Sequence, residues 1–340
     1  MDYKIFDNNT EVAFEQAEST PIFNRLEWFS LFEYFICNDN FFAQTMFFSN
    51  QSKQFILPLA SSGEHLSSLT NYYNPFFKLL GSVEASTEDY MDIVQSGQHF
   101  FKKHPVIDLL PLYSQDVENW KKAFENIGFK AFTYQHTVNW YHDNISDLDQ
   151  YWALRPSKLR NTLKRKKAKL EKSGEYSLIM AEPGDVLELN HYLAEYHHVY
   201  YDSWKKAEPY PAFIDAIAKY AWKQGELRLG LVYHKNIPVA AQIWFVNTKT
   251  AYIYKLAYRC DYTKASVGTV LTGAMIEHVI EQDKVNCIDY LTGDDAYKQD
   301  WMQSKRPLMG IQLCNVSTMA GKKAYFRNTL SSIRKQIGFE

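Results

Sequence analysis

SVGTVLTGAMIEHVIEQDKVNCIDYLTGDDAYKQDW, residues 266–301, contains a helix pattern, a short strand pattern and a dense polar segment in immediate succession. From about Ser266 the apolar residues recur at steps of three and four, which predicts an amphipathic helix. These residues are Val267, Val270, Leu271, Ala274, Met275 and Val279. NCIDYL (286–291) then predicts a short buried strand, and a helix that leads into such a strand predicts a crossover onto a parallel neighbour.

The segment upstream of this stretch predicts an antiparallel meander. ELRLGLVYH (226–234) and IPVAAQIWFV (237–246) flank the turn KN and have the pattern of a hairpin. A third strand pattern, AYIYKLAYR (251–259), follows the polar turn NTKT. This half of the chain therefore predicts three antiparallel strands, a crossover helix and one more strand parallel to the third.

The N-terminal half has patterns in the same order. A helix pattern precedes three strand patterns, a helical window, a buried strand, a second helix and a last strand that closes this half. They occupy residues 22–37, 41–49, 54–61, 65–73, 87–104, 105–112, 116–128 and 129–142. We therefore expect an α+β fold with two tandem domains, 1–145 and 146–340, each a mixed and mostly antiparallel sheet flanked by helices.

Composition narrows the class of protein. The chain has 340 residues, of which 46% are hydrophobic and 22% charged, and its net charge is −2. These values indicate a globular protein of about two domains, and they do not indicate a polyanion partner for the whole chain.

Four widely spaced cysteines indicate reduced thiols. No HExxH motif, P-loop or clustered Cys/His set occurs, so we expect no metal site. Residues 1–16 lack a signal-peptide pattern, and no apolar run of about 18 residues occurs. We therefore expect a cytoplasmic protein without a transmembrane segment.

RPSKLRNTLKRKKAKLEKSG (155–174) predicts a basic helix at 157–173. It has eight basic residues and one acid, and Leu159, Leu163 and Leu170 form a thin apolar stripe. Such a run is ordinarily a solvated helix face. The alternative is a surface that binds phosphates of a nucleotide-linked sugar, coenzyme A, tRNA or an anionic lipid.

YRCDYTKASVGTVL (258–271) leads from the third strand of the meander into the long helix. Ser266, Gly268 and Thr269 are small and begin that helix, where free backbone N–H groups and the helix dipole suit a pyrophosphate. Gly268 permits a close approach of the backbone to a ligand. Ser266 as an ordinary N-cap, without a ligand, is the alternative.

Residues 266–301 resemble the CelD-type acetyltransferase branch of the GNAT superfamily, which is named for cellulose-biosynthesis proteins. That branch has a small-residue turn with Gly-Thr, a helix, a strand with Ile/Phe-Asp, and then Gly-Asp-x-x-Tyr-Lys. The matching residues are Gly268, Thr269, Asp289, Gly293, Asp294, Tyr297 and Lys298. YYDSWKK (200–206) and the basic helix are also similar to segments of this family, so the resemblance covers residues 150–310.

GNAT enzymes hold the coenzyme A pyrophosphate in the loop between the meander and the crossover helix. The resemblance therefore implies five cofactor-binding residues, although their order departs from the usual Gln/Arg-x-x-Gly-x-Gly/Ala. They are Lys264, Ser266, Val267, Gly268 and Thr269. It also implies a β-bulge or splay between the third strand and the parallel strand, which exposes backbone N–H groups to the thioester carbonyl.

The branch is similar to the FemABX peptidyltransferases, which have two GNAT-like domains and transfer an amino acid from aminoacyl-tRNA to a peptidoglycan precursor. This likeness implies a degenerate GNAT-like domain at 1–145 and a GNAT-like acyltransferase domain at 146–340. FemABX enzymes have a long helical arm for tRNA, whereas residues 184–224 hold at most two ordinary helices. That difference favours an acyl-CoA donor.

The resemblance also implies catalytic roles. Lys298 is the candidate partner of the oxyanion or of a substrate anion, and Tyr297 could donate a proton to the departing thiolate. Asp294 or Asp295 could accept the proton of the amine or bind the incoming ammonium. For both aspartates, turn capping after a strand is the alternative.

EYHHVYYDSW (195–204) supplies further candidates. His198 could be a general base with a pKa near neutral, and a structural histidine is the alternative. Tyr201 and Trp204 could line an acceptor or acyl pocket, or belong to the core. Tyr254 and Lys255 lie in the middle of a strand that GNAT substrates pass, and an ordinary half-exposed strand pair is the alternative.

Three functions remain open. The first is an N-acyltransferase that uses acetyl-CoA or another acyl-CoA and acts on an amino sugar, a nucleotide-linked amino sugar or an amino acid, for polysaccharide or cell-envelope biosynthesis. The second is a FemABX-like transferase that depends on aminoacyl-tRNA. The third is a non-enzymatic binding protein of a biosynthetic cluster.

For the first function the partners are a small amine and acyl-CoA, without a metal or a specific nucleic acid. A monomer and a homodimer both stay open. The basic amphipathic segment 322–340 is a candidate for peripheral membrane contact, for a partner or for the body of the protein, and we expect the body.

Overall fold

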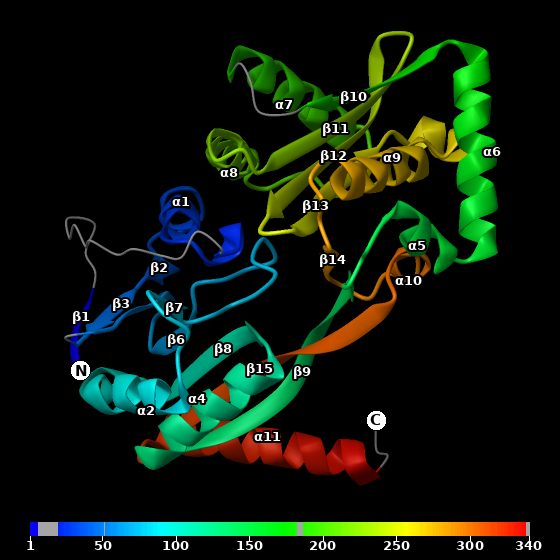
Figure 1. Cartoon of the computed structure of the whole chain (residues 1–340). Coiled ribbons are helices and arrows are strands. Elements are labelled where there is room, and N and C mark those ends of the chain that lie inside the picture. Colours follow the sequence, from blue (N-terminus) through cyan, green and yellow to red (C-terminus); the bar gives the residue numbers. More distant parts are fainter. Residues whose placement is uncertain (6–19, 51, 182–185, 338–340) are drawn as a thin grey trace. The chain divides into compact units, whose positions relative to one another are not determined.

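Figure 1 shows a computed structural model of the chain. It describes residues 1–5, 20–50, 52–181 and 186–337. Parts of three segments discussed above, 1–16, 184–224 and 322–340, lie outside the described residues. Within the described part, no helix is both long and apolar enough to cross a membrane.

The chain divides into two compact units. Unit 1 comprises Met1–Val138 and Pro307–Glu340, and unit 2 comprises Asn139–Arg306. The segment 307–340 thus belongs with the N-terminal part, whereas the sequence led us to expect it in a domain 146–340. Each unit has strands with parallel and antiparallel neighbours and several helices, which confirms the predicted α+β class.

Unit 2 is a sheet of long strands with helices between them. Its helices and strands, in chain order, are the end of β9 (Phe129–His142), α5 (Leu148–Ala153), α6 (Ser157–Ser173), β10 (Tyr176–Ala181), α7 (Val186–Tyr201), α8 (Pro211–Lys223), β11 (Leu227–His234), β12 (Ile237–Asn247), β13 (Thr250–Tyr258), η2 (Cys260–Ala265), α9 (Val267–Glu281), β14 (Cys287–Thr292), α10 (Lys298–Trp301) and the start of β15 (Ser304–Asn315). The basic helix α6 has the predicted bounds, and α7 and α8 are the two ordinary helices expected after residue 184.

The order of strands in unit 2 confirms the predicted meander and crossover. β10, β11, β12 and β13 are antiparallel neighbours in that order, and β14 lies parallel to β13 after the crossover helix α9. Residues 238–245 of β12 are all buried, so both faces of this strand are covered. α9 and α7 supply contacts to it. The apolar residues of α9 therefore enter the core of unit 2, as their spacing predicts.

Unit 1 contains two sheets. Its helices and strands are β1 (Asp2–Ile5), η1 (Ile22–Asn24), α1 (Leu26–Ile36), β2 (Phe42–Ala43), β3 (Met46–Ser49), β4 (Gln54–Leu57), β5 (Leu59–Ser62), β6 (His65–Ser68), β7 (Leu80–Gly81), α2 (Thr87–Ser96), α3 (Gln98–Phe101), β8 (Val106–Leu112), α4 (Ser114–Asn126), most of β9, most of β15 and α11 (Met319–Ile337). β6 lies parallel to β8, with α2 and α3 between them in the chain. Both units thus have a parallel strand pair joined by a helical crossover.

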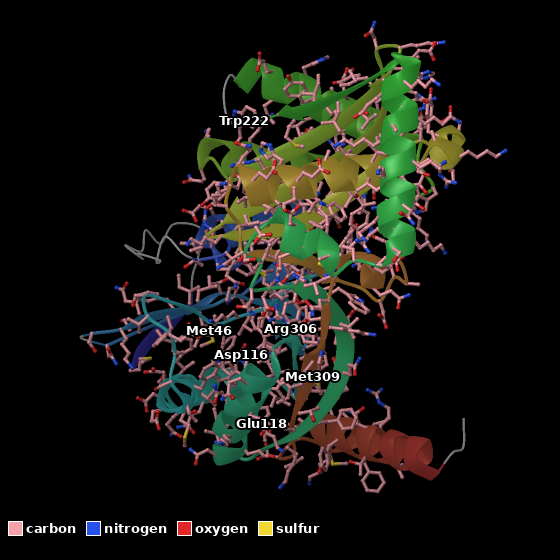
Figure 2. All side chains as sticks on the ribbon, turned by 45° about the vertical axis from the view of Figure 1, so that its right-hand side comes forward. Met46, Asp116, Glu118, Trp222, Arg306 and Met309 are labelled. Atoms are coloured by element: carbon pink, nitrogen blue, oxygen red, sulfur yellow. The ribbon has the colours of Figure 1, made fainter. Side chains whose placement is uncertain are left out.

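The helices of unit 1 cover an aromatic core. On α4 the carboxylate of Asp116 is buried, and the hydroxyl of Tyr90 donates to it at 2.9 Å, whereas Glu118 is exposed (Figure 2). The amphipathic pattern of α4 accounts for this division of one helix into an inner and an outer side.

Two expectations about strands were wrong. Residues 54–61 form two strands, because β4 ends before Pro58 and β5 begins after it. β4 pairs with β3 in the small sheet, whereas β5 pairs with β6 in the larger one. Proline has no N–H to donate to a ladder, so the break between the two sheets falls at that residue.

The second error concerns 129–142, which we expected to close the N-terminal half. The end of β9 pairs instead with β14 of unit 2, through Tyr141 and His142. In unit 1 the antiparallel neighbour of β8 is β15, which comes much later in the chain. A pairing between residues so far apart leaves no trace in local patterns.

Candidate functional site

β13 and β14 separate part of the way along their length. Their parallel ladder runs from the pair Thr250–Cys287 to the pair Tyr252–Asp289, although β13 continues to Tyr258. The ladder between β12 and β13 shifts register opposite Tyr254, which is the extra residue of a bulge. The splay between β13 and β14 that the resemblance implies is therefore present, whereas the bulge lies on the other side of β13, in its ladder with β12.

The loop after β13 leads into the N-terminus of α9. Ser266 lies in the left-handed region with φ of 59° and its side chain makes no capping hydrogen bond, so it is not an ordinary N-cap. Among the described residues, none accepts a hydrogen bond from the backbone N–H groups of Val267, Gly268 and Thr269. Three free N–H groups at the positive end of a helix dipole form a place for an anion.

Gly268 is required by packing. A Cβ there would lie 2.8 Å from Cδ1 of Tyr258, which is too close for any side chain. The Tyr258 ring also packs against Trp204, with 4.4 Å between ring centroids. Trp204 is half exposed, so the structure places this candidate substrate residue beside the helix N-terminus.

The basic helix α6 reaches the same loop. The ammonium of Lys166 donates a hydrogen bond to the carbonyl of Lys264 in η2, and Lys167 forms an ion pair with Glu277 of α9 at 3.0 Å. Leu163 packs directly over Gly273, where a Cβ would lie 2.8 Å from it. The positive charge of α6 is thus held next to the open N-terminus of α9 (Figure 1).

Lys298 is the first residue of α10 and contacts the end of β14. Its side chain is almost fully buried, and its ammonium donates to the carbonyls of Tyr290 at 3.1 Å and Thr292 at 2.5 Å. Asp295 lies 3.7 Å from the ammonium, and burial lowers the pKa of Lys298 despite this carboxylate. An ammonium has three protons, and two of them are donated to carbonyls of β14.

Tyr297 precedes that lysine and is 42% exposed. Its ring packs edge-on against Tyr290 at 5.6 Å, and the two hydroxyls are hydrogen-bonded. Burial and the neighbouring Asp295 raise the pKa of Tyr297 to about 12. The phenol is therefore protonated at neutral pH, which a proton donor requires.

Asp294 and Asp295 differ in their surroundings. Asp294 accepts hydrogen bonds from Lys305 at 2.7 Å and from the indole of Trp140 at 3.1 Å, and these bonds hold its pKa below the ordinary value. A carboxylate stabilised in this way is a weak proton acceptor. Asp295 is about equally exposed and faces Lys298 instead.

Lys255 and Lys205 belong to a buried charge cluster. Lys255 forms an ion pair of 2.9 Å with Glu208, whose side chain is 4% exposed. The ammonium of Lys205 lies over the rings of Tyr200 and Trp204, at 5.6 and 5.8 Å from their centroids. Burial, and in second place the charge of Lys255, lower the pKa of Lys205 to about 8.

This cluster also adjoins the end of β14, because Asp295 and Lys298 act electrostatically on Lys205. Sequence reasoning missed two of its members. Lys205 is part of YYDSWKK (200–206), but nothing in that segment was a reason to assign it a function. Glu208 lies in the loop AEPYP (207–211), whose sequence does not predict that its side chain is buried.

Two candidates lie apart from this cluster. Tyr201 is 82% exposed at the end of α7. His198 is exposed and lies 3.8 Å from Asp202, which also forms an ion pair with Arg259. His197 pairs instead with Asp215 of α8 at 2.7 Å, which fastens two helices together. Among the described residues, no group of His, Cys, Asp or Glu side chains is suited to hold a metal ion.

Comparison with known proteins agrees with this geometry. Residues 157–299 match the family described as acetyltransferase (GNAT) domain. That range begins with α6 and ends after Lys298, so it contains the loop, the open helix and the end of β14. No curated protein matches the chain.

Several solved structures share the fold. FemX has a TM-score of 0.56 and 10% identity, over 86% of this chain and 96% of that one. L-PGS from Bacillus licheniformis has a TM-score of 0.56 and 9% identity, over 94% and 98%. The C-terminal domain of a putative lysylphosphatidylglycerol synthetase from Agrobacterium fabrum has a TM-score of 0.54 and 13% identity, over 83% and 87%. At such identities the likeness concerns the fold alone. The chain thus contains a GNAT-type acetyltransferase domain at residues 157–299 and is an acyltransferase with the fold of FemX.

Proposed function

We propose that unit 2 transfers an acyl group from an acyl-CoA, with acetyl-CoA the foremost candidate, to the amino group of a small molecule. The observation that carries this proposal is the open N-terminus of α9, where the N–H groups of Val267, Gly268 and Thr269 have no acceptor among the described residues. A coenzyme A pyrophosphate is a dianion of the size that such a helix end binds.

The surrounding residues favour the same ligand. Lys264 lies in the loop before the helix, and Lys166 of the basic helix α6 is anchored on its carbonyl. Two lysines and a helix dipole add positive potential where the pyrophosphate would lie. Trp204 and Tyr258 form an aromatic pair beside Gly268, which suits the pantetheine chain or the acyl group.

In the proposed reaction the amine attacks the thioester carbonyl, the C–S bond breaks and the amide forms. The developing oxyanion would take hydrogen bonds from backbone N–H groups of β13 beyond its last pair with β14. The third proton of the Lys298 ammonium is a further donor. Tyr297, whose pKa is raised to about 12, would protonate the departing thiolate.

The incoming ammonium must lose a proton before it attacks. Lys205 is the group whose pKa, at about 8, suits this step, because its neutral amine can accept a proton near physiological pH. Asp295 is placed to attract the ammonium. Asp294 is engaged with Lys305 and Trp140, so we assign it a structural role instead.

The acceptor class follows from the resemblance to the CelD-type branch and not from a contact. We propose an amino sugar, a nucleotide-linked amino sugar or an amino acid, in polysaccharide or cell-envelope biosynthesis. His198, Tyr201, Tyr254 and Lys255 remain candidates for its contacts. We also propose that the N-terminal domain, residues 1–145, is a degenerate GNAT-like domain.

Aminoacyl-tRNA is the second candidate donor. Seven basic residues of α6 are exposed, which is more positive charge than one pyrophosphate needs. This chain also shares the fold of FemX, and the FemABX enzymes use aminoacyl-tRNA as their donor. The two ordinary helices α7 and α8, in place of a long arm, weigh against this donor.

Thermal unfolding in the presence of acetyl-CoA, free coenzyme A or aminoacyl-tRNA tests the donor. A true acyl-CoA site predicts stabilisation that grows by about 1.4 kcal/mol for each tenfold increase in ligand above the Kd. Thiol release with a panel of amines then tests turnover. Stabilisation and transfer only with aminoacyl-tRNA would replace the first donor with the second.

A further inference from the structure

The C-terminal helix α11 packs on unit 1 by one side. Gly321 is buried against the backbone of Asn315, and no side chain would fit between them. Ala324 is 8% exposed, and the amide of Asn328 donates to the side-chain carbonyl of Gln312 on β15. The expectation that this segment docks on the body is therefore met by this side of the helix.

The opposite side carries large apolar side chains in solvent. Met319 is 81% exposed, Phe326 68% and Leu330 46%. Steps of seven and four residues place them on one helical face, within about 60° of each other. They line a shallow hollow of about 850 Å³ that runs along the helix. A face with three exposed apolar side chains on one helix needs a covering partner.

The charge on α11 indicates what that partner is. The helix sequence has five basic residues and no acidic one. Lys322 and Lys323 line the same hollow as Phe326, so the ammonium groups flank the apolar stripe. Long basic side chains beside an apolar stripe are the arrangement of helices that lie in the interface of a bilayer with anionic headgroups.

A second copy of the chain fits this face poorly. In a two-fold contact each face meets itself, so Lys322 and Lys323 of one copy would approach those of the other. Like charges brought together in this way oppose association. We propose that α11 docks the protein on a membrane surface rich in anionic phospholipid, with Phe326 and Leu330 entering the interface and Lys322 and Lys323 contacting phosphates. This inference is independent of the donor that unit 2 uses.

Co-sedimentation of the full chain with vesicles tests the inference. We expect binding to vesicles of phosphatidylcholine mixed with phosphatidylglycerol, weak binding to phosphatidylcholine alone, and weaker binding at high salt. Each exposed lysine near the surface contributes about a fivefold factor in affinity, so Lys322→Gln should lower binding by about that factor. Phe326→Asp should lower it by at least about tenfold.

Tyr34→Asp is the matched control, because Tyr34 is an equally exposed aromatic residue of unit 1 on the acidic helix α1. It should leave vesicle binding unchanged, and circular dichroism should show all three variants folded. Equal sedimentation of the parent chain and Phe326→Asp would overturn the proposal. So would light scattering that shows a dimer which Phe326→Asp dissolves, because a second copy would then cover this face.

Discussion

The two crossover helices of the molecule begin in opposite ways. In unit 1 the N-terminus of α2 is closed by a capping box, in which Ser86 accepts from the N–H of Asp89 and Asp89 accepts from the N–H of Ser86. In unit 2 the N-terminus of α9 follows a left-handed Ser266 that caps nothing. At the start of α2 a hydroxyl and a carboxylate satisfy two N–H groups, whereas three N–H groups at the start of α9 have no acceptor among the described residues.

The ends of the parallel strands differ in the same sense. Near the end of β8, the carbonyl of Leu110 accepts hydrogen bonds from the neutral hydroxyls of Ser68 and Thr70, at 2.7 and 2.9 Å. Near the end of β14, the carbonyls of Tyr290 and Thr292 accept from the ammonium of Lys298. Carbonyls near the end of the parallel strand thus accept from neutral hydroxyls in unit 1 and from an ammonium in unit 2.

The parallel strands β8 and β14 also have a feature in common. Asp108 of β8 accepts from the amide of Gln312 at 3.1 Å and also pairs with His65 at 3.2 Å, and Asp289 of β14 accepts from the amide of Asn139 at 2.6 Å. Burial raises the pKa of both carboxyls, that of Asp289 to about 6. The units thus share an aspartate in the parallel strand, which is buried in unit 2 and partly buried in unit 1.

The largest effect is expected at Lys298. Lys298→Ala removes the donor proposed for the oxyanion, and the loss of one such donor lowers kcat by about 100- to 1000-fold. It also leaves the carbonyls of Tyr290 and Thr292 without their partner, so the free energy of unfolding should fall by about 1–3 kcal/mol. Steady-state kinetics and urea unfolding measure the two effects. Lys53→Ala in unit 1 is the control, which should leave turnover unchanged, and full activity of Lys298→Ala would remove the assigned role.

Asp289 should make stability depend on pH. Its folded pKa of about 6 lies above the unfolded value of 3.8, so the folded state holds the proton more tightly. The free energy of unfolding therefore falls as pH rises from about 4 to about 6, by about 2–3 kcal/mol for this one group. Asp289→Asn should remove most of that slope in urea unfolding curves measured across this range. An unchanged slope would mean that the carboxyl ionises freely.

Lys205 should set the rising limb of the pH profile. If its neutral amine is the base, kcat/KM rises with pH up to about 8 and is constant above that value. Lys205→Met should lower the plateau by at least about tenfold and abolish the rise. Lys206→Met is the neighbouring control. A rise that persists in Lys205→Met would assign the base elsewhere.

The capping box of α2 should matter for stability alone. Burial by itself would raise the pKa of Asp89, but hydrogen bonds from Lys53 and Ser86 hold it below the ordinary value. Asp89→Ala removes the cap and should cost about 1 kcal/mol at pH 7, and the difference from the parent should vanish as pH falls through the folded pKa. Activity should not change. A loss of activity with normal stability would mean that unit 1 takes part in the reaction.

Local patterns predicted what depends on neighbours in the chain. The spacing of apolar residues located α9, and the hairpin turn located β11 and β12. The sequence shows Pro58, which ends β4. It does not show that β4 and β5 then join different sheets, because that depends on strands elsewhere in the chain. The pairing of β9 with β14 joins residues about 150 positions apart, and no local propensity encodes it.

The candidate site was predicted in part for the same reason. The resemblance pointed to the loop 264–269 and to Tyr297 and Lys298, which are contiguous in sequence. Glu208 became visible only through its ion pair with Lys255, which lies on another element. The low pKa of Lys205 results from burial, which residue identity does not reveal.

The central claim is that the open N-terminus of α9 holds the pyrophosphate of the acyl donor. Thr269 is the third residue of α9, as Asp89 is of α2, so Thr269→Asp places a carboxylate in the first turn of α9, where α2 also has one. Thr269→Asn is its neutral control. The measurement is a calorimetric titration of the three proteins with acetyl-CoA.

We predict binding by the parent chain and by Thr269→Asn, and a loss of about 100-fold or more in Thr269→Asp, because a carboxylate in the first turn of α9 repels a dianion bound to its N–H groups. The aspartate variant should unfold at the same temperature as the parent or at a higher one. Undiminished binding of acetyl-CoA by Thr269→Asp, or no binding by the parent, would contradict the claim.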